Sequence, residues 1–241
     1  MIASTVLMGP ATRNRFCHRI SRDGLQNRGI LLIIGHRGWP ARFPDNSLAG
    51  IRAAADVASM VEVDVRRDNS GVLVLSHDAP AGQPLTLDQA LAALPSLSFN
   101  LEIKNFPGDV GFEADHGLAL ECAAKSRAGD LLTCFYWPTI DEVRLRYREV
   151  ATGLLIDAGA SISDATAHAL HLGHGTLVPN WELVLSQPDA TREAAASGLV
   201  IAVWTLNDPT KALALAKLGV SAIITDDPGF MADALSKRIA T

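Results

Sequence analysis

Seven side chains of the types used for proton transfer, metal binding and anion binding collect at four apolar runs early in the chain. Each lies within such a run or within three residues after it, where a strand would end. In a parallel α/β barrel, working residues lie at the carboxyl ends of the strands, so we expect these side chains to converge. They are His36, Arg37, Glu62, Asp64, His77, Glu102 and Lys104.

The three acids have the spacing of inward-facing residues. Glu62 and Asp64 are two residues apart on a predicted strand, so they share one face, and valines occupy the other face. Glu102 and Lys104 show the same alternation on the next parallel strand. Buried carboxylates repel one another and lose hydration, and a hard divalent cation with oxygen ligands would offset both effects. The alternative is a buried salt-bridge network with Arg37 and Lys104.

The two histidines, His36 and His77, each follow an apolar run almost directly. One such histidine is often a core residue, but two beside a group of carboxylates favour a general acid–base pair. Arg37 offers a planar fork for phosphate, and Lys104 offers a point charge. Asp78 could pair with a neighbouring group or hold its own loop. Together these residues indicate metal-assisted cleavage of a phosphodiester.

The elements that must position these residues alternate between strand and helix. Strand-length apolar runs lie at 30–34, 60–65, 72–76, 98–103, 131–135, 152–156, 175–178, 199–204 and 221–225. Helical patterns lie at 47–58, 87–94, 113–127, 140–148, 190–196 and 209–218. The turn sequence within 66–71 is too short for a crossover helix, so the third run should form a hairpin on the second. The pattern predicts a (β/α)8 TIM barrel with an extra hairpin strand after its second strand.

The composition of the chain excludes several classes of protein. The chain has 241 residues, of which 48% are hydrophobic and 20% charged, which is typical of a globular protein. A net charge of −5 argues against a nucleic-acid partner held by electrostatics. No apolar stretch reaches the length of a membrane span. The three cysteines have no ligand spacing and indicate neither a disulfide framework nor a zinc site. We take the cytoplasm as the expected location.

Residues 1–28 differ from the rest of the chain. They carry five arginines against a single acid, Asp23, and show no hydrophobic periodicity. The order of charge and apolar residues is wrong for a secretory signal, whereas the composition permits an organellar transit peptide. We predict a loosely ordered basic tail, followed by a single barrel domain over residues 29–241.

The same residues lie in motifs that resemble the glycerophosphodiester phosphodiesterase family. Seven segments match in the family's order and span most of the chain. They are GHRG at 35–38, FPDNS at 43–47, VEVDVR at 61–66, VLSHD at 74–78, LEIK at 101–104, VWTLN at 203–207 and IITDDP at 223–228.

The resemblance implies a function and a role for each matching residue. It implies a phospholipase-C-like barrel that hydrolyses glycerophosphodiesters to glycerol 3-phosphate and an alcohol, with one divalent cation, Ca²⁺ or Mg²⁺. In this reading the substrate is a small-molecule or lipid-derived phosphodiester. The implied roles are acid–base catalysis for His36 and His77, metal ligation for Glu62, Asp64 and Glu102, phosphate binding for Arg37 and Lys104, pocket lining near the leaving group for Trp204 and Asn207, and support around the site for Asp45, Asn46 and Asp78.

The chain departs from the family pattern at two places. Asp45 stands where a glutamate is usual, so any contact with the metal would be altered by the shorter side chain. Only 23 residues separate Asp78 from Glu102, where many bacterial relatives carry a small subdomain over the site. We therefore expect an open mouth that relaxes selectivity for a small headgroup. A compact chain of this kind also resembles the related spider-venom phospholipases D, although it lacks their cysteine pattern.

The sequence is also compatible with two other functions and with a second candidate site. A lysophospholipase-D-like enzyme would need an apolar surface near the mouth, and a non-catalytic phosphodiester-binding protein would not need two proton carriers. Elsewhere, His168, His171 and His174 recur every three residues. They permit a metal triad, but histidines near a helix C-terminus are the favoured interpretation.

Overall fold

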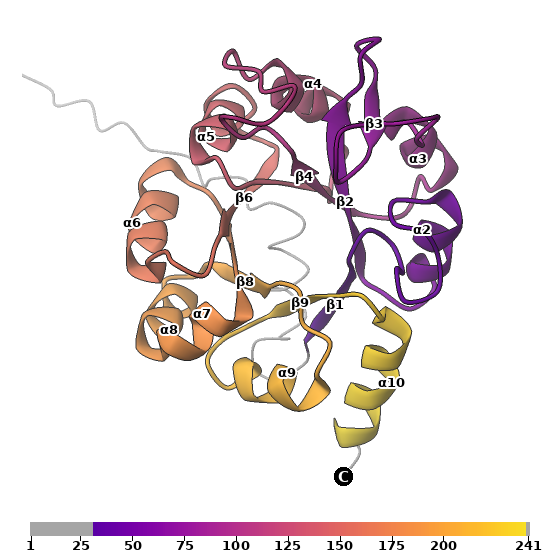
Figure 1. The fold of residues 1–241 in the computed structure, drawn as a ribbon. Helices are drawn as coiled ribbons and strands as arrows, with labels where there is room; N and C mark the ends of the chain where they lie inside the picture. The colour runs from indigo at the N-terminus through magenta and orange to yellow at the C-terminus, as the bar shows by residue number, and fades with distance from the viewer. Residues whose placement is uncertain (1–30, 240–241) are drawn as a thin grey trace, which may run out of the picture.

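Eight parallel strands close into a ring in the computed structural model, which describes residues 31–239 (Figure 1). The ring closes where β1 pairs with β2 in parallel, which confirms the predicted barrel. The predicted basic tail, residues 1–28, lies outside the described residues. The ring strands are β1 (Leu32–Gly35), β2 (Met60–Arg67), β4 (Phe99–Ile103), β5 (Leu131–Cys134), β6 (Ala151–Ile156), β7 (Thr176–Pro179), β8 (Val200–Val203) and β9 (Ala222–Thr225).

The extra strand is the predicted hairpin. β3 (Leu73–Leu75) pairs antiparallel with the end of β2 and lies outside the ring. Asp68 accepts hydrogen bonds from the backbone N–H groups of Ser70 and Val72, and Gly71 has a φ of 87°. These contacts form the turn that the sequence predicted, because glycine tolerates the left-handed backbone there.

The helices cover the outside of the ring. Side chains cap the starts of two of them: Thr86 forms a capping box with Gln89, and Asp208 accepts from the backbone N–H groups of Thr210 and Lys211. The helices are α2 (Leu48–Ala55), α3 (Leu87–Ala93), α4 (Gly117–Lys125), α5 (Trp137–Arg146), α6 (Ile162–Leu172), α7 (Trp181–Ser186), α8 (Pro188–Ala196), α9 (Pro209–Ala216) and α10 (Pro228–Ile239).

Alternation along the strands divides the apolar residues into two groups. Val61, Val63 and Val65 of β2 belong to the large core between the ring and the helices. Met60, on the opposite face of β2, belongs to a smaller cluster with residues such as Leu155 from other strands, which fills the barrel interior. The same inner face continues through position 62 to position 64, so each strand leads from an apolar interior to a charged mouth.

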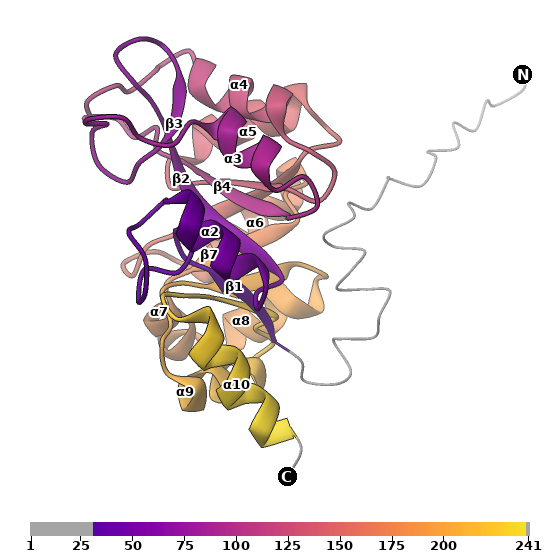
Figure 2. The same ribbon diagram turned by 90° about the vertical axis from the view of Figure 1, so that its right-hand side faces the viewer.

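The loops that follow the strands gather at one end of the barrel. This end faces the viewer in Figure 1 and lies on the left in Figure 2. Between Asp78 and Glu102 the chain contains only a loop, α3 and the start of β4, so the shortened insertion is confirmed. Within residues 31–239, every helix is too short or too polar to cross a bilayer.

Candidate active site

The loop after β1 places two of the predicted residues, His36 and Arg37. It turns sharply: Arg37 has a φ of 48° and Gly38 a φ of 93°. A side chain at position 35 would bring a Cβ to 2.4 Å from the carbonyl oxygen of Gly38, so that position also requires glycine. The left-handed Arg37 is backbone strain at a candidate functional residue. Its N–H donates to Glu62 Oε2 over 2.9 Å, which holds the turn against β2.

Glu62, Asp64 and Glu102, here called the acidic cluster, meet at the ends of β2 and β4. Asp64 is directly paired with Glu102 in the sheet register. One oxygen from each carboxylate lies within 4.8 Å of the others, and all three residues are buried. The predicted convergence of these acids is therefore present in the fold.

Two cations partly neutralise the acidic cluster, as the salt-bridge alternative required. Arg37 Nε lies 3.1 Å from Asp64 Oδ2, and Lys104 Nζ lies 2.8 Å from Asp64 Oδ1. Lys104 also pairs with Glu102. Burial by itself raises the pKa of Asp64, but the Lys104 and Arg37 charges overcome it and hold that pKa below its ordinary value. Asp64 is thus a well-compensated anion.

Glu62 is not compensated in the same way. Its Oε2 accepts from the Arg37 backbone, whereas its buried Oε1 has no hydrogen-bond or ion-pair partner among residues 31–239. Burial and the neighbouring Asp64 charge raise the pKa of Glu62 to about 8. An unpaired buried carboxylate oxygen is costly, so a cation at this position would relieve it. The all-oxygen donor set fits a hard ion such as Ca²⁺ or Mg²⁺.

His36 is oriented by Asp226, which was not predicted from the sequence as a site residue. His36 Nδ1 donates to Asp226 Oδ1 over 2.7 Å, and Nε2 then faces the acidic cluster, 3.9 Å from Glu62 Oε2. Burial alone lowers the pKa of His36, but the Asp226 hydrogen bond and the Glu62 charge more than offset it, so the pKa is raised. Asp226 lies in the recognised IITDDP segment, directly after β9, and β9 pairs with β1. That adjacency is the signal that could have identified it.

Asn207 belongs to the same network. Its Nδ2 donates to Asp226 Oδ2 over 2.7 Å, and its Oδ1 accepts from the Asp226 backbone and from Thr225 Oγ1. Asn207 therefore fixes the carboxylate that fixes His36. Trp204, predicted with it as a pocket residue, lies above the barrel interior, where Nε1 donates to the Val178 carbonyl over 3.0 Å.

His77 lies on the loop after β3, the hairpin partner of β2. Its Nδ1 donates to Asp78 Oδ1 over 2.9 Å, and its carbonyl accepts from Arg66 Nε over 2.8 Å. The His77 side chain is 43% exposed and that of Asp78 is 92% exposed, so this pairing is open to water. The two histidines thus differ in setting: His36 is half-buried and clamped, and His77 borders the open mouth.

The two remaining predicted residues support Arg37 and Asp64. Asp45 Oδ2 accepts from Arg37 Nη1 over 3.0 Å at the exposed rim. The side chain of Asn46, which is itself left-handed with a φ of 55°, donates to Asp64 Oδ2 and accepts from the Asp64 N–H. Asn46 therefore holds Asp64 from the side opposite Lys104. Asp45 pairs with the predicted phosphate-binding arginine and lies outside the acidic cluster.

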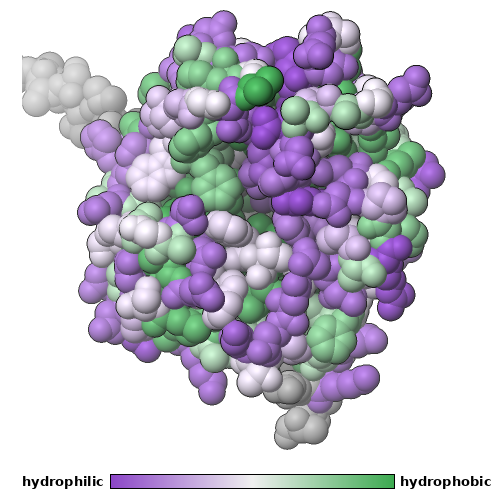
Figure 3. All heavy atoms as spheres, viewed as in Figure 1, coloured by the Kyte–Doolittle hydropathy of each residue, from purple (hydrophilic) through white to green (hydrophobic). Residues whose placement is uncertain are grey.

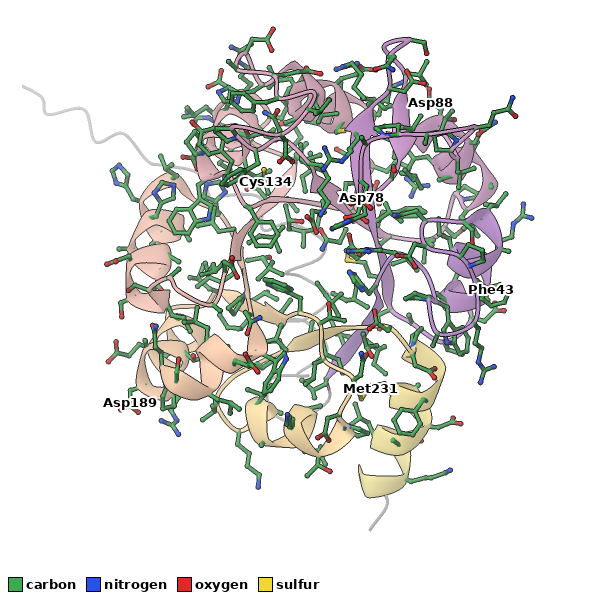
Figure 4. The ribbon with its side chains drawn as sticks, viewed as in Figure 1. Phe43, Asp78, Asp88, Cys134, Asp189 and Met231 are labelled. Atoms are coloured by element: carbon green, nitrogen blue, oxygen red, sulfur yellow. The ribbon has the colours of Figure 1, made fainter. Side chains whose placement is uncertain are left out.

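A cavity of about 600 Å³ opens beside Lys104 and His77. One wall carries the polar residues, and the other is aromatic. In Figure 3 the central hollow has hydrophilic atoms on its right and more apolar atoms at its upper left. Figure 4 labels Cys134, which lines the cavity, and to its right Asp78, the neighbour of the lining residue His77. Residues lining the cavity include His77, Lys104, Phe106, Phe135, Tyr136 and Trp137.

A parallel barrel with histidines, buried acids and cations at the carboxyl ends of its strands carries the kinds of group that hydrolysis of a phosphodiester uses. A family model described as the glycerophosphoryl diester phosphodiesterase family matches residues 36–82 and 79–230. The chain therefore belongs to that family and is a phosphoric diester hydrolase.

Relatives and solved structures agree with this family. A probable glycerophosphodiester phosphodiesterase 2 of Mycobacterium tuberculosis is 26% identical, over 87% of this chain and 92% of its own length. A glycerophosphodiester phosphodiesterase of Parabacteroides distasonis superposes with a TM-score of 0.75 at 22% identity, over 86% of this chain and 98% of that one. A phosphodiesterase of Oleispira antarctica in complex with the product sn-glycerol-3-phosphate superposes with a TM-score of 0.72 at 21% identity, over 88% and 99% of the two chains.

Proposed function

We propose that the enzyme hydrolyses glycerophosphodiesters to glycerol 3-phosphate and an alcohol, using His36 and His77 as general acid and base and one divalent cation held by the acidic cluster. The observation that carries the proposal is the unpartnered, buried Oε1 of Glu62 in the acidic cluster, whose other oxygen lies 3.9 Å from His36 Nε2. The Oleispira antarctica relative, whose structure contains sn-glycerol-3-phosphate, supports this choice of substrate.

Each side chain then has a stated task. Arg37 and Lys104 place positive charge at the mouth, where they bind the phosphodiester anion. One histidine removes the proton from the attacking hydroxyl, and the other protonates the departing alkoxide. The attacking hydroxyl belongs to water or to the neighbouring carbon of the glycerol, which would give a cyclic phosphate first. When bound, Ca²⁺ or Mg²⁺ supplies Lewis-acid stabilisation of charge on the phosphoryl oxygens.

The experiment is turnover of a panel of glycerophosphodiesters by the full chain, with and without chelator. Release of glycerol 3-phosphate that is lost with chelator and restored by Mg²⁺ or Ca²⁺ is expected. Full activity in excess chelator would contradict the metal assignment. Absence of turnover on every glycerophosphodiester would contradict the substrate class.

A second candidate substrate is a lysophospholipid, and the aromatic wall of the cavity favours it. Phe106, which lines the cavity, is 49% exposed, and Val110, on the same loop after β4, is 84% exposed. An acyl chain would remove this apolar surface from water, at about 25 cal/mol per Å² buried.

A matched pair of variants separates the two substrates. Phe106→Ser should raise KM for a lysophospholipid and leave KM for a short glycerophosphodiester unchanged. Leu145→Ser, at an exposed leucine on the outer face of α5, is the control and should change neither value. If Phe106→Ser affects both substrates equally, the wall does not bind an acyl chain.

A further inference from the structure

A second group of metal-ligating side chains lies outside the ring, between α5 and α6. Asp141 is on α5, His168 is on α6, and His174 follows α6 just before β7. His168 Nε2 lies 3.0 and 3.1 Å from the two Asp141 oxygens, and His174 Nε2 lies 2.9 Å from Asp141 Oδ1. One donor atom from each residue lies within 4.8 Å of the others. We call these three residues the α5–α6 triad.

Local structure explains why only two of the three periodic histidines join the α5–α6 triad. α6 ends at Gly173, whose φ of 85° reverses the chain, and the N–H groups of residues 173 and 174 both bond to the Ala169 carbonyl. This cap folds His174 back beside His168, and the two rings are parallel within 11°. His171 points away and is exposed. The interval of three in the sequence therefore does not identify the group. His168 and His174 lie together, and Asp141 of α5 completes it.

Both histidines are held in place from behind. His174 Nδ1 lies 2.8 Å from Thr152 Oγ1, and the His174 side chain is fully buried. The His168 ring lies 5.1 Å from the ring of Trp137. Metal-ligating histidines usually have their second nitrogen hydrogen-bonded, as His174 has through Thr152, which fixes the direction of the donor nitrogen. The α5–α6 triad is accordingly preorganised, with His168 and Asp141 partly open to solvent.

The carboxylate is already in its anionic form. Burial raises the pKa of Asp141, but the hydrogen bonds from His174 and His168 outweigh burial and hold the pKa below its ordinary value. Without a metal, each Nε2 must carry a proton to donate to Asp141. A metal ion at Nε2 would require the tautomer that carries the proton on Nδ1, where His174 can donate it to Thr152 Oγ1. The ion would then be bound by two imidazole nitrogens and one carboxylate oxygen, with an open position towards solvent.

We propose that the α5–α6 triad is a binding site for Zn²⁺ or a similar borderline divalent metal, separate from the acidic cluster at the mouth. Imidazole nitrogens suit zinc, copper and nickel, whereas the three carboxylates of the acidic cluster suit Ca²⁺ and Mg²⁺. The two sites therefore select different ions. The bound ion would join α5, α6 and the start of β7, next to Trp137 in the cavity wall. This proposal does not depend on the substrate.

The test is zinc binding by the full chain after chelator treatment, in excess Mg²⁺ so that the acidic cluster is occupied by the harder ion. Calorimetry and metal analysis after gel filtration give the zinc equivalents bound per chain. His168→Ala should bind one equivalent fewer than the wild type and should lose the zinc-dependent rise in Tm. His168 is partly exposed, so this variant should fold, and its metal-free Tm checks that it does.

Two controls make the result specific. His171→Ala removes an exposed histidine of the same helix and should bind as much zinc as the wild type. Glu62→Gln perturbs the acidic cluster and should also keep the zinc equivalent. The proposal is overturned if His168→Ala retains the full zinc equivalent, or if zinc fails to bind the wild type at micromolar concentration. In either case the α5–α6 triad would be a hydrogen-bonded structural cluster.

Discussion

His36 Nδ1 lies 2.7 Å from Asp226 Oδ1, a contact between residues 190 positions apart that joins the end of β1 to the end of β9. The contact exists because the barrel closes, which makes the first and last strands neighbours. Asp226 is itself held by Asn207 over 2.7 Å. The arrangement fixes the His36 ring and stabilises its protonated form, as an acid paired with a catalytic histidine does in hydrolytic triads.

Asp226→Asn should therefore slow the enzyme without removing the catalytic group. The loss should be smaller than the about 10²–10⁴-fold typical of losing a general acid or base. Because Asp226 raises the pKa of His36, its removal should lower that pKa. The limb of the kcat/KM profile that reports His36 should move to lower pH. An unchanged profile in Asp226→Asn would show that Asp226 has only a structural role.

The acidic cluster predicts a pH-dependent stability. The pKa of Glu62 is raised from 4.5 to about 8 in the metal-free protein, so the folded state binds a proton that the unfolded state releases. Between these pH values, stability contributed by this group falls as pH rises. The metal-free wild type should lose Tm from pH 6 to pH 8, and Glu62→Gln should lose less. Added Mg²⁺ should raise the wild-type Tm more at pH 8 than at pH 6.

An exposed carboxylate supplies the control for this measurement. Glu193→Gln on α8 removes one acid from the surface and should follow the wild-type pH dependence. If Glu62→Gln and Glu193→Gln behave alike, the burial of Glu62 does not control stability. Glu62→Gln should also weaken Mg²⁺ or Ca²⁺ binding, measured by calorimetry.

The alternation of side chains along β2 predicted which residues face the mouth of the barrel, because alternation is a local property of a strand. Val61 and Val63 pack outwards while Glu62 and Asp64 face inwards, as their spacing required.

The start of α4 was predicted too early, since residues 113–116 form no helix. His116 adopts a φ of 61°, which a right-handed helix cannot contain, so α4 begins at Gly117.

Contacts that form only when distant elements pack together could not be predicted from local sequence patterns. Asp226 becomes a partner of His36 only when β9 lies beside β1. Asp141 becomes a partner of His168 only when α5 packs beside α6. No sequence interval encodes either pairing, although the position of Asp226 directly after the last strand was a usable signal.

Trp204 should affect substrate binding more than chemistry. Its ring meets Phe135 of the cavity wall edge-on, with centroids 5.4 Å apart, and its Nε1 is occupied by the Val178 carbonyl. It has no free donor to offer to a reacting oxygen. Trp204→Ala should chiefly raise KM, and Trp204→Phe should restore much of the binding. The matched control is Trp181→Ala. It removes a tryptophan ring whose centroid lies 4.0 Å from Lys211 Nζ. Loss of turnover at saturating substrate in Trp204→Ala would contradict this role.

The two histidines should be inseparable in their effect on rate. His36→Ala and His77→Ala should each lower kcat by about 10²–10⁴-fold, the usual contribution of a general acid or base. The double variant should be scarcely slower than either single one, because each proton transfer is of little use without the other. His171→Ala, which removes an exposed histidine, should retain the wild-type rate.

Leaving-group acidity then assigns the two roles. A nitrophenyl ester departs without needing a proton, so it should restore much of the rate in the variant that lacks the acid. The variant that lacks the base should stay slow, since the attacking hydroxyl still has to lose its proton. The kcat/KM profile of the wild type should be bell-shaped, because one histidine must be neutral and the other protonated. If both single variants keep near-wild-type rates on the natural ester, or if neither responds to the leaving group, His36 and His77 are not the acid–base pair.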